Sequence, residues 1–159
     1  MTALRPTISG ILRAFFDERM QGTSGVRLQR IRRTEVRLRA FLENEGERGL
    51  VPADLALLAA ERQIQPADAF CRLMHADDLV FVLFAFVEEP WLEREILDRR
   101  MQLALVEKLV ARLLLRGLVD REEVICPLLD LRNRLDVARR QLRVDVDRRR
   151  RGMSDTPSR

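Results

Sequence analysis

The side chains that could carry out chemistry are few and poorly placed for it. His75 is the only histidine, and the two cysteines, Cys71 and Cys126, lie far apart in the sequence. On a single helix Cys71, His75 and Asp78 would share one face, but three residues leave a tetrahedral zinc site without its fourth ligand. We therefore expect no metal site. We interpret both cysteines as buried, reduced thiols, with a disulfide or a reactive thiol as the alternative.

The chain also lacks the motifs of the common enzyme classes. It contains no Gly-x-Ser-x-Gly nucleophile motif and no Gly-x-x-x-x-Gly-Lys phosphate-binding loop. Three pairs of carboxylates are adjacent in sequence, namely Asp77–Asp78, Glu88–Glu89 and Glu122–Glu123. Adjacent residues of a helix point about 100° apart, so these pairs do not form catalytic dyads. We expect no catalytic residue, no cofactor and no enzymatic activity.

Arginine is the residue type that does indicate a function. Of 29 basic residues, Lys108 is the only lysine. The codon usage of a GC-rich genome would give the same excess, but the distribution of charge is more informative. Residues 1–39 carry a net charge of +6, residues 40–98 of −9, and residues 99–159 of +7. Basic segments rich in arginine are typical of surfaces that contact phosphate groups.

Two basic clusters are candidates for contact with nucleic acid, one near each end of the chain. The first contains Arg27, Arg30, Arg33 and Arg37, and the second contains Arg139, Arg140 and Arg143. No aromatic residues are interleaved with them, which favours contact with the backbone of a duplex or hybrid over base stacking on a single strand. The alternative is that these arginines form a solvated face, or one paired with acids from residues 43–98.

The elements that carry these residues are expected to be helices. Leucine, alanine, arginine and glutamate dominate, and all four have high helix propensity. Apolar periodicity and capping residues predict helices at Thr7–Gln21, Ser24–Asn44, Pro52–Gln63, Ala67–Met74, Ala76–Glu88 and Trp91–Gly117, and from Pro127 onward. Asp98 is a candidate N-cap if the sixth helix is interrupted. We predict a compact, irregular all-α bundle of six to eight helices, formed by residues 1–147, with a basic disordered tail at residues 148–159.

The most apolar stretch is the run Leu79–Val87, which is flanked by acids on both sides. Several of its residues favour β-strands, but no second strand is evident, so we predict a helix at the centre of the core. A subunit interface is the alternative. The run is far shorter than the roughly 20 residues that span a bilayer, and the N-terminus has no signal peptide. We expect a cytoplasmic protein with no membrane contact.

Two stretches resemble a known domain. Residues 7–42 contain Thr-Ile-Ser-Gly-Ile-Leu-Arg-Ala-Phe-Phe, then Gly-Thr-Ser-Gly-Val-Arg-Leu-Gln-Arg-Ile-Arg-Arg and Leu-Arg-Ala-Phe-Leu. They resemble the first two helices of the core-binding domain of tyrosine recombinases and phage integrases, and residues 99–127 resemble its last helix. The resemblance implies an all-α clamp on duplex DNA that uses the basic second helix, Arg99 and Arg100.

The chain also departs from that family. The catalytic domain is absent, no tyrosine is present to act as the nucleophile, and residues 45–95 would be an acidic insertion. Small helical subunits of CRISPR ribonucleoprotein complexes are similar in size and charge. We therefore predict a non-catalytic nucleic-acid-binding protein, or a subunit of a larger nucleoprotein complex. The alternative is a protein–protein assembly subunit, an adaptor or a homo-oligomer, with no role in nucleic-acid binding.

Overall fold

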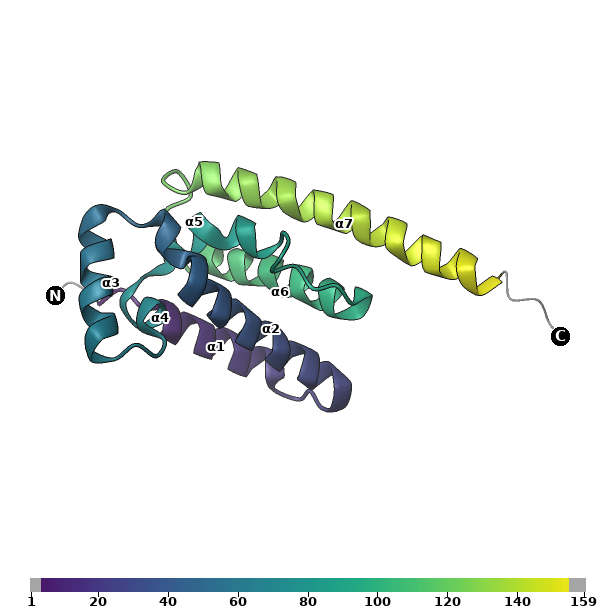
Figure 1. Ribbon diagram of the computed structural model, residues 1–159, viewed down its shortest axis with the longest axis horizontal. Helices are drawn as coiled ribbons and strands as arrows, with labels where there is room; N and C mark the ends of the chain where they lie inside the picture. The colour runs from purple at the N-terminus through teal and green to yellow at the C-terminus, as the bar shows by residue number, and fades with distance from the viewer. Residues whose placement is uncertain (1–3, 155–159) are drawn as a thin grey trace.

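The computed structural model describes residues 4–154, and the regular elements in this range are helices. They are α1 (Ile8–Met20), α2 (Gly25–Glu45), the 3-10 helix η1 (Gly46–Gly49), α3 (Pro52–Ile64), α4 (Ala69–Leu73), α5 (Ala76–Phe86), α6 (Ile96–Leu115) and α7 (Ile125–Ser154). In Figure 1, α3 crosses one end of the bundle and α7 projects from the other. The predicted all-α bundle of six to eight helices is confirmed, with seven α-helices in the described range.

Helix α5 forms the centre of the core. Its residues Leu79, Val80, Leu83 and Phe86 are fully buried, and the helix packs against α2, α7 and η1. A helix that is apolar on nearly all sides is stable only when neighbours surround it, which explains the position of this run. The predicted helical core at residues 79–87 is confirmed. Within residues 4–154, no helix has the combination of length and apolar character that crossing a membrane requires.

Several predicted helix ends are also confirmed. The Thr7 hydroxyl accepts a hydrogen bond from the Gly10 N–H and caps α1, because the first N–H groups of a helix have no partner within it. Gly22 has a φ of 67° in the turn between α1 and α2, a conformation that glycine adopts without steric cost. Pro52 occupies the first turn of α3.

The predicted helix Ala67–Met74 is shorter in the structure and does not begin at Pro66. Asp68 has a left-handed φ of 53°, and α4 runs only from Ala69 to Leu73. A left-handed residue cannot continue a right-handed helix, so Asp68 separates Pro66 from α4.

The short α4 also removes the helical face predicted for Cys71, His75 and Asp78. Cys71 lies on α4, whereas His75 caps the start of α5. The Asp78 carboxylate accepts a hydrogen bond from the His75 N–H at 3.0 Å. Cys71 therefore lies on a different helix from Asp78, and the three side chains are not aligned on one helix.

The prediction that a helix begins at Trp91 is wrong. Residues 87–95 form an irregular connection, α6 begins at Ile96, and its N-cap is Glu95 instead of Asp98. The connection can avoid helical structure because side chains from α2 and α6 bind its backbone groups, as described below.

Helix α7 is longer than predicted. It begins at Ile125 and continues through Ser154, so residues 148–154 of the predicted disordered tail are helical. Arginine has high helix propensity, and Arg149 forms an ion pair with Glu95 at 3.1 Å. Residues 147–154 are all exposed, and Figure 1 shows this end of α7 extending beyond the other helices. The remainder of the predicted tail, residues 155–159, lies outside the described residues.

Candidate nucleic-acid interface

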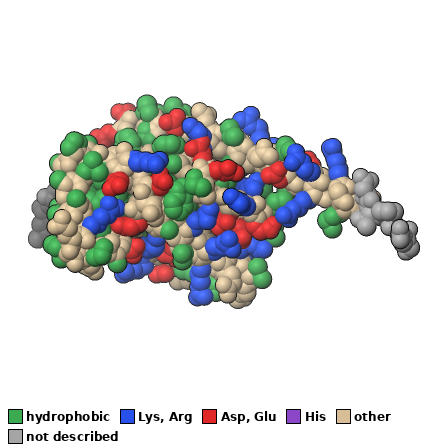
Figure 2. All heavy atoms as spheres, viewed as in Figure 1, with side chains coloured by type: hydrophobic (Ala, Val, Ile, Leu, Met, Phe, Trp, Pro, Cys, Tyr) green, Lys and Arg blue, Asp and Glu red, His purple; other side chains and the backbone are tan. Residues whose placement is uncertain are grey.

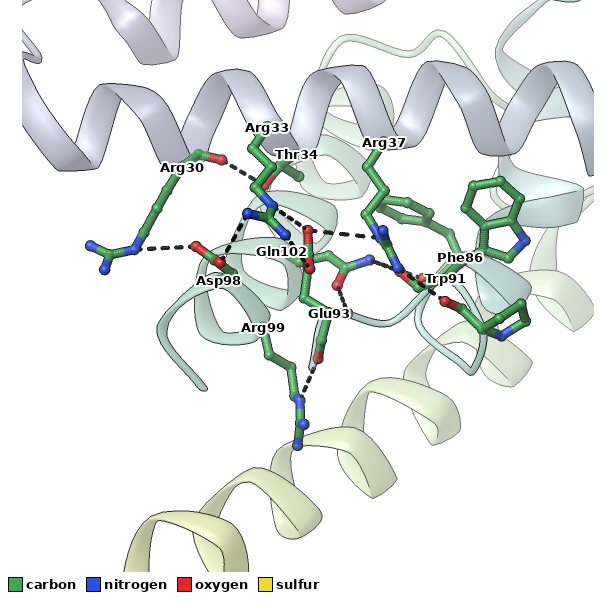
Figure 3. A network of polar contacts seen from close by, with 11 residues as sticks. Arg30, Arg33, Thr34, Arg37, Phe86, Trp91, Glu93, Asp98, Arg99 and Gln102 are labelled. Atoms are coloured by element: carbon green, nitrogen blue, oxygen red, sulfur yellow. Dashed lines mark hydrogen bonds and ion pairs between the residues drawn. The ribbon is translucent and has the colours of Figure 1, made fainter. Parts of the chain in front are cut away.

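Three arginines of α2, Arg30, Arg33 and Arg37, point toward the connection 87–95 and the start of α6 (Figure 3). Arg33 donates two hydrogen bonds to the two carboxylate oxygens of Glu93, at 3.0 and 3.4 Å. Arg30 Nε lies 3.3 Å from Asp98 Oδ1. The hydrogen bond that Arg33 donates to Glu93 raises the pKa of Arg33. Glu93 is buried, so removing its arginine partner would leave an unpaired carboxylate in the protein interior.

Arg37 binds the backbone of the same connection. It donates to the Trp91 carbonyl at 2.5 Å and to the Pro90 carbonyl at 3.0 Å. Its guanidinium also lies 6.0 Å from the centre of the Trp91 ring, within the range of a cation–π contact. Arg37 thus holds α2 against the connection.

Gln102 of α6 supports the connection from the other side. Its side chain is fully buried. It donates to the carbonyls of Phe86 and Trp91 at 3.1 and 3.0 Å, and it accepts from the Glu93 N–H at 2.8 Å. One side-chain amide therefore pairs three backbone groups that the irregular chain leaves without helical partners.

Pairing with acids from residues 43–98, the alternative set out above, is the arrangement found for Arg30, Arg33 and Arg37. A phosphate group would have to displace these internal contacts before it could bind. A phosphate would also have to displace internal contacts of Arg99, which donates to Asp145 at 2.7 Å and to the Glu93 carbonyl at 2.8 Å. The hydrogen bond from Arg99 lowers the pKa of Asp145.

Arg139 is also paired, because it contacts Glu107 of α6. The other four candidates, Arg27, Arg100, Arg140 and Arg143, are exposed. In the described part of the chain they form no ion pair. The nine candidates thus divide into five with internal partners and four without.

Two of the unpaired arginines meet at a shallow depression between α6 and α7. Its volume is about 420 Å³, and it is lined by Arg100, Arg139, Leu142, Arg143, Val146, Asp147 and Arg150. Arg150 belongs to the predicted basic tail, and its spacing of seven residues from Arg143 places both on one helical face. We use the name α7 basic end for this depression together with the exposed arginines Arg148 and Arg151, which follow it on α7. Lys and Arg side chains are visible on the projecting part of α7 in Figure 2.

A second, more apolar groove lies further along the same two helices. It has a volume of about 820 Å³. Its apolar lining includes Leu114, Leu115, Ile125, Leu128, Leu129 and Leu135. Leu115 is 88 % exposed, so the groove presents an apolar rim to solvent.

The two thiols differ from the expectation that both are buried. Cys71 is buried, and Cys126 is exposed on α7; both are free. Cys126 precedes the buried Pro127 and lies on the solvent side of the first turn of α7. In residues 4–154, no group of three or more His, Cys, Asp or Glu side chains is arranged to hold a metal ion.

Iodoacetamide at neutral pH is expected to alkylate Cys126 in the folded protein and to leave Cys71 unmodified. The thiolate is the reactive form, and burial raises the pKa of Cys71 to about 12. Peptide mass spectrometry before and after unfolding in urea checks this, and Cys126→Ser is the control that should show no native adduct. Native labelling of Cys71 would contradict its burial.

Comparisons with known proteins identify no matching family model, no matching curated protein and no matching solved structure. The resemblance to the recombinase core-binding domain therefore stays a prediction, and the case for function rests on the geometry of the chain itself.

Proposed function

We propose that this is a non-enzymatic protein that binds the phosphate backbone of nucleic acid through the α7 basic end. The observation that carries the proposal is the convergence of Arg100, Arg143 and Arg150 on one depression. These three side chains have no ion pair within residues 4–154, unlike Arg30, Arg33 and Arg37 of α2, so they are available to a phosphate without breaking an internal contact.

The shape of α7 fits this proposal. Exposed arginines continue along the projecting helix at Arg148 and Arg151, and Asp147 is the one acid among residues 146–154. A helix that stands clear of its bundle fits the major groove of duplex DNA, which is about 12 Å wide. Binding that depends on arginine–phosphate pairs releases counterions and weakens steeply as salt increases.

Removing Arg143 and Arg150 is the direct test. The double variant Arg143→Gln/Arg150→Gln is expected to bind duplex DNA about tenfold more weakly for each arginine removed. The slope of log K against log salt should fall in magnitude by about 2. Fluorescence anisotropy with a labelled duplex, a DNA–RNA hybrid and a single strand, measured over a salt series, gives both quantities.

The matched control removes the same charge from α2. Arg27 and Arg32 are exposed on that helix, and Arg27→Gln/Arg32→Gln should leave affinity nearly unchanged. If the control weakens binding as much as the α7 variant does, the contact is not at the α7 basic end. If the wild-type protein binds none of the three ligands at about 50 mM salt, the proposed function is wrong.

A second candidate function, a protein assembly subunit, is favoured by the apolar groove between α6 and α7. An exposed apolar surface of this kind is typical of interaction sites. Arg30, Arg33 and Arg37 also form ion pairs with Glu93 and Asp98. Here the opposite charges of two segments stabilise the fold, and these arginines need no nucleic-acid partner.

A further inference from the structure

Helix α6 carries an exposed stripe with the spacing of a coiled coil. The stripe is Leu97, Met101, Ala104, Lys108, Ala111 and Leu115, at intervals of four, three, four, three and four residues. Such intervals place all six on one helical face. Leu97 is 49 % exposed and Leu115 88 %. Lys108 and Ala111 are exposed, and Met101 and Ala104 are half-buried. We name this set the α6 stripe.

We propose that a second copy of this chain covers the α6 stripe, with the two α6 helices antiparallel about a twofold axis. The proposal rests on the second candidate function and commits it to one partner. The intervals of the stripe read the same in both directions. An antiparallel pair therefore places Leu97 opposite Leu115 of the second copy, Met101 opposite Ala111, and Ala104 opposite Lys108. A twofold interface requires this kind of self-complementarity.

The position of Lys108 favours the antiparallel orientation. A parallel pair would place Lys108 against Lys108 of the second copy in the same layer, where like charges repel. In the antiparallel pair Lys108 faces an alanine, and Glu107 of the second copy lies within one helical turn of that alanine. Glu107 is an acid already held at this edge by Arg139. Lys108 is the only lysine of the chain, and it stands near the middle of the stripe.

The flank of the stripe that faces α1 and α2 is also complementary in charge between the two copies. Asp98 and Arg112 flank the stripe near its two ends, so the antiparallel pair brings Asp98 of one copy to Arg112 of the other. In one copy, Asp98 pairs with Arg30 and Arg112 pairs with Glu18. The contact would join these pairs into a row of alternating charges across the interface, the arrangement that favours specific association.

The apolar groove widens this interface beyond a single helix. Helix α6 is about 30 Å long, and a stable complex buries about 1,200–2,000 Å² in total. The groove is lined by Ala111 and Leu115 of the stripe, and it adds Ile125 and Leu129 of α7 to the apolar surface beside them. The two copies would then meet through both α6 and the start of α7.

Sedimentation velocity without nucleic acid tests the dimer. The wild-type protein is expected to sediment as a dimer, and Leu115→Glu as a monomer of half the mass. Because Leu115 is 88 % exposed, the variant should keep its helical circular dichroism. Val137→Glu is the matched control, because Val137 is 56 % exposed on α7 outside the stripe, and it should remain dimeric.

Disulfide trapping tests the orientation in a Cys126→Ser background. Mixed Leu97→Cys and Leu115→Cys chains should crosslink under mild oxidation, whereas Leu115→Cys alone should not. In the antiparallel pair the two Leu115 positions lie about 27 Å apart, and a disulfide needs Cα atoms within about 7 Å.

A wild-type monomer at millimolar concentration, a dimer that survives Leu115→Glu, or crosslinking of Leu115→Cys to itself would overturn this proposal. The proposed nucleic-acid binding fails separately. A chain that dimerises without binding DNA contradicts the proposed role of the α7 basic end but supports the dimer. A monomer that binds DNA supports the role of the α7 basic end but contradicts the dimer.

Discussion

Replacing Gln102 by leucine is expected to lower the free energy of unfolding by about 3 kcal/mol or more. The leucine side chain has similar volume but offers no hydrogen bond. The Phe86 carbonyl and the Glu93 N–H would lose the partner that Gln102 supplies, and each buried, unpaired backbone group costs about 1–3 kcal/mol. The Trp91 carbonyl would keep its hydrogen bond from Arg37, which limits the loss.

Urea unfolding followed by circular dichroism measures this effect. Gln29→Leu is the matched control, because Gln29 is exposed on α2 and surface substitutions usually change stability by no more than about 0.5 kcal/mol. Hydrogen exchange gives an independent readout, since the Glu93 amide should lose its protection in Gln102→Leu. Unchanged stability together with a protected Glu93 amide would show that Gln102 does not hold the connection.

The connection 87–95 is also where prediction from the sequence failed, and the reason is physical. Its conformation depends on Gln102 and Arg37, which reach backbone carbonyls of the segment. A backbone carbonyl has the same chemistry at every residue, so no pattern in the side chains indicates which one a distant glutamine will bind. Apolar periodicity predicted a helix that begins at Trp91, because periodicity reports only the local spacing of apolar residues.

The central helix α5 was predictable for the opposite reason. Its apolar run carries the information locally, since nine successive apolar residues can be stabilised only by burial. The N-caps Thr7 and Ser24 and the first-turn Pro52 are local signals as well. These features depend on neighbouring residues in the sequence, whereas the connection 87–95 depends on distant partners.

The arginine candidates show the same division. Composition identified an excess of positive charge, but not which arginines face acids from distant segments. Arg33 and Glu93 are 60 positions apart in sequence, and Arg99 and Asp145 are 46 apart. The net charges of the three segments therefore combine arginines that form internal ion pairs with arginines that are exposed to solvent. Part of the positive charge of α2 is used to attach the acidic connection, and the exposed positive charge is concentrated on α7.

Replacing Gly46 by alanine is expected to lower the free energy of unfolding by about 2 kcal/mol, although the backbone would accept the change. Gly46 has an ordinary helical φ of −60°. An added Cβ, however, would lie 2.6 Å from Cζ of Phe70 and 2.8 Å from both of its Cε atoms. Phe70 is fully buried on α4, so its ring cannot move aside without repacking the core. Overpacking of this kind costs about 1–3 kcal/mol.

Two comparisons make the Gly46 prediction specific. Gly10→Ala, on the exposed side of α1, would place its Cβ 3.6 Å from Thr7 Oγ1, an ordinary contact, and should stabilise by up to about 1 kcal/mol. Phe70→Leu removes ring atoms at the clash, so the double variant Gly46→Ala/Phe70→Leu should lose less stability than the sum of the two single losses. Strict additivity in urea unfolding would mean that Gly46 is not required by the Phe70 ring. In that case, the contact between Gly46 of η1 and Phe70 of α4 would not be what fixes the packing of the end of α2 on the core.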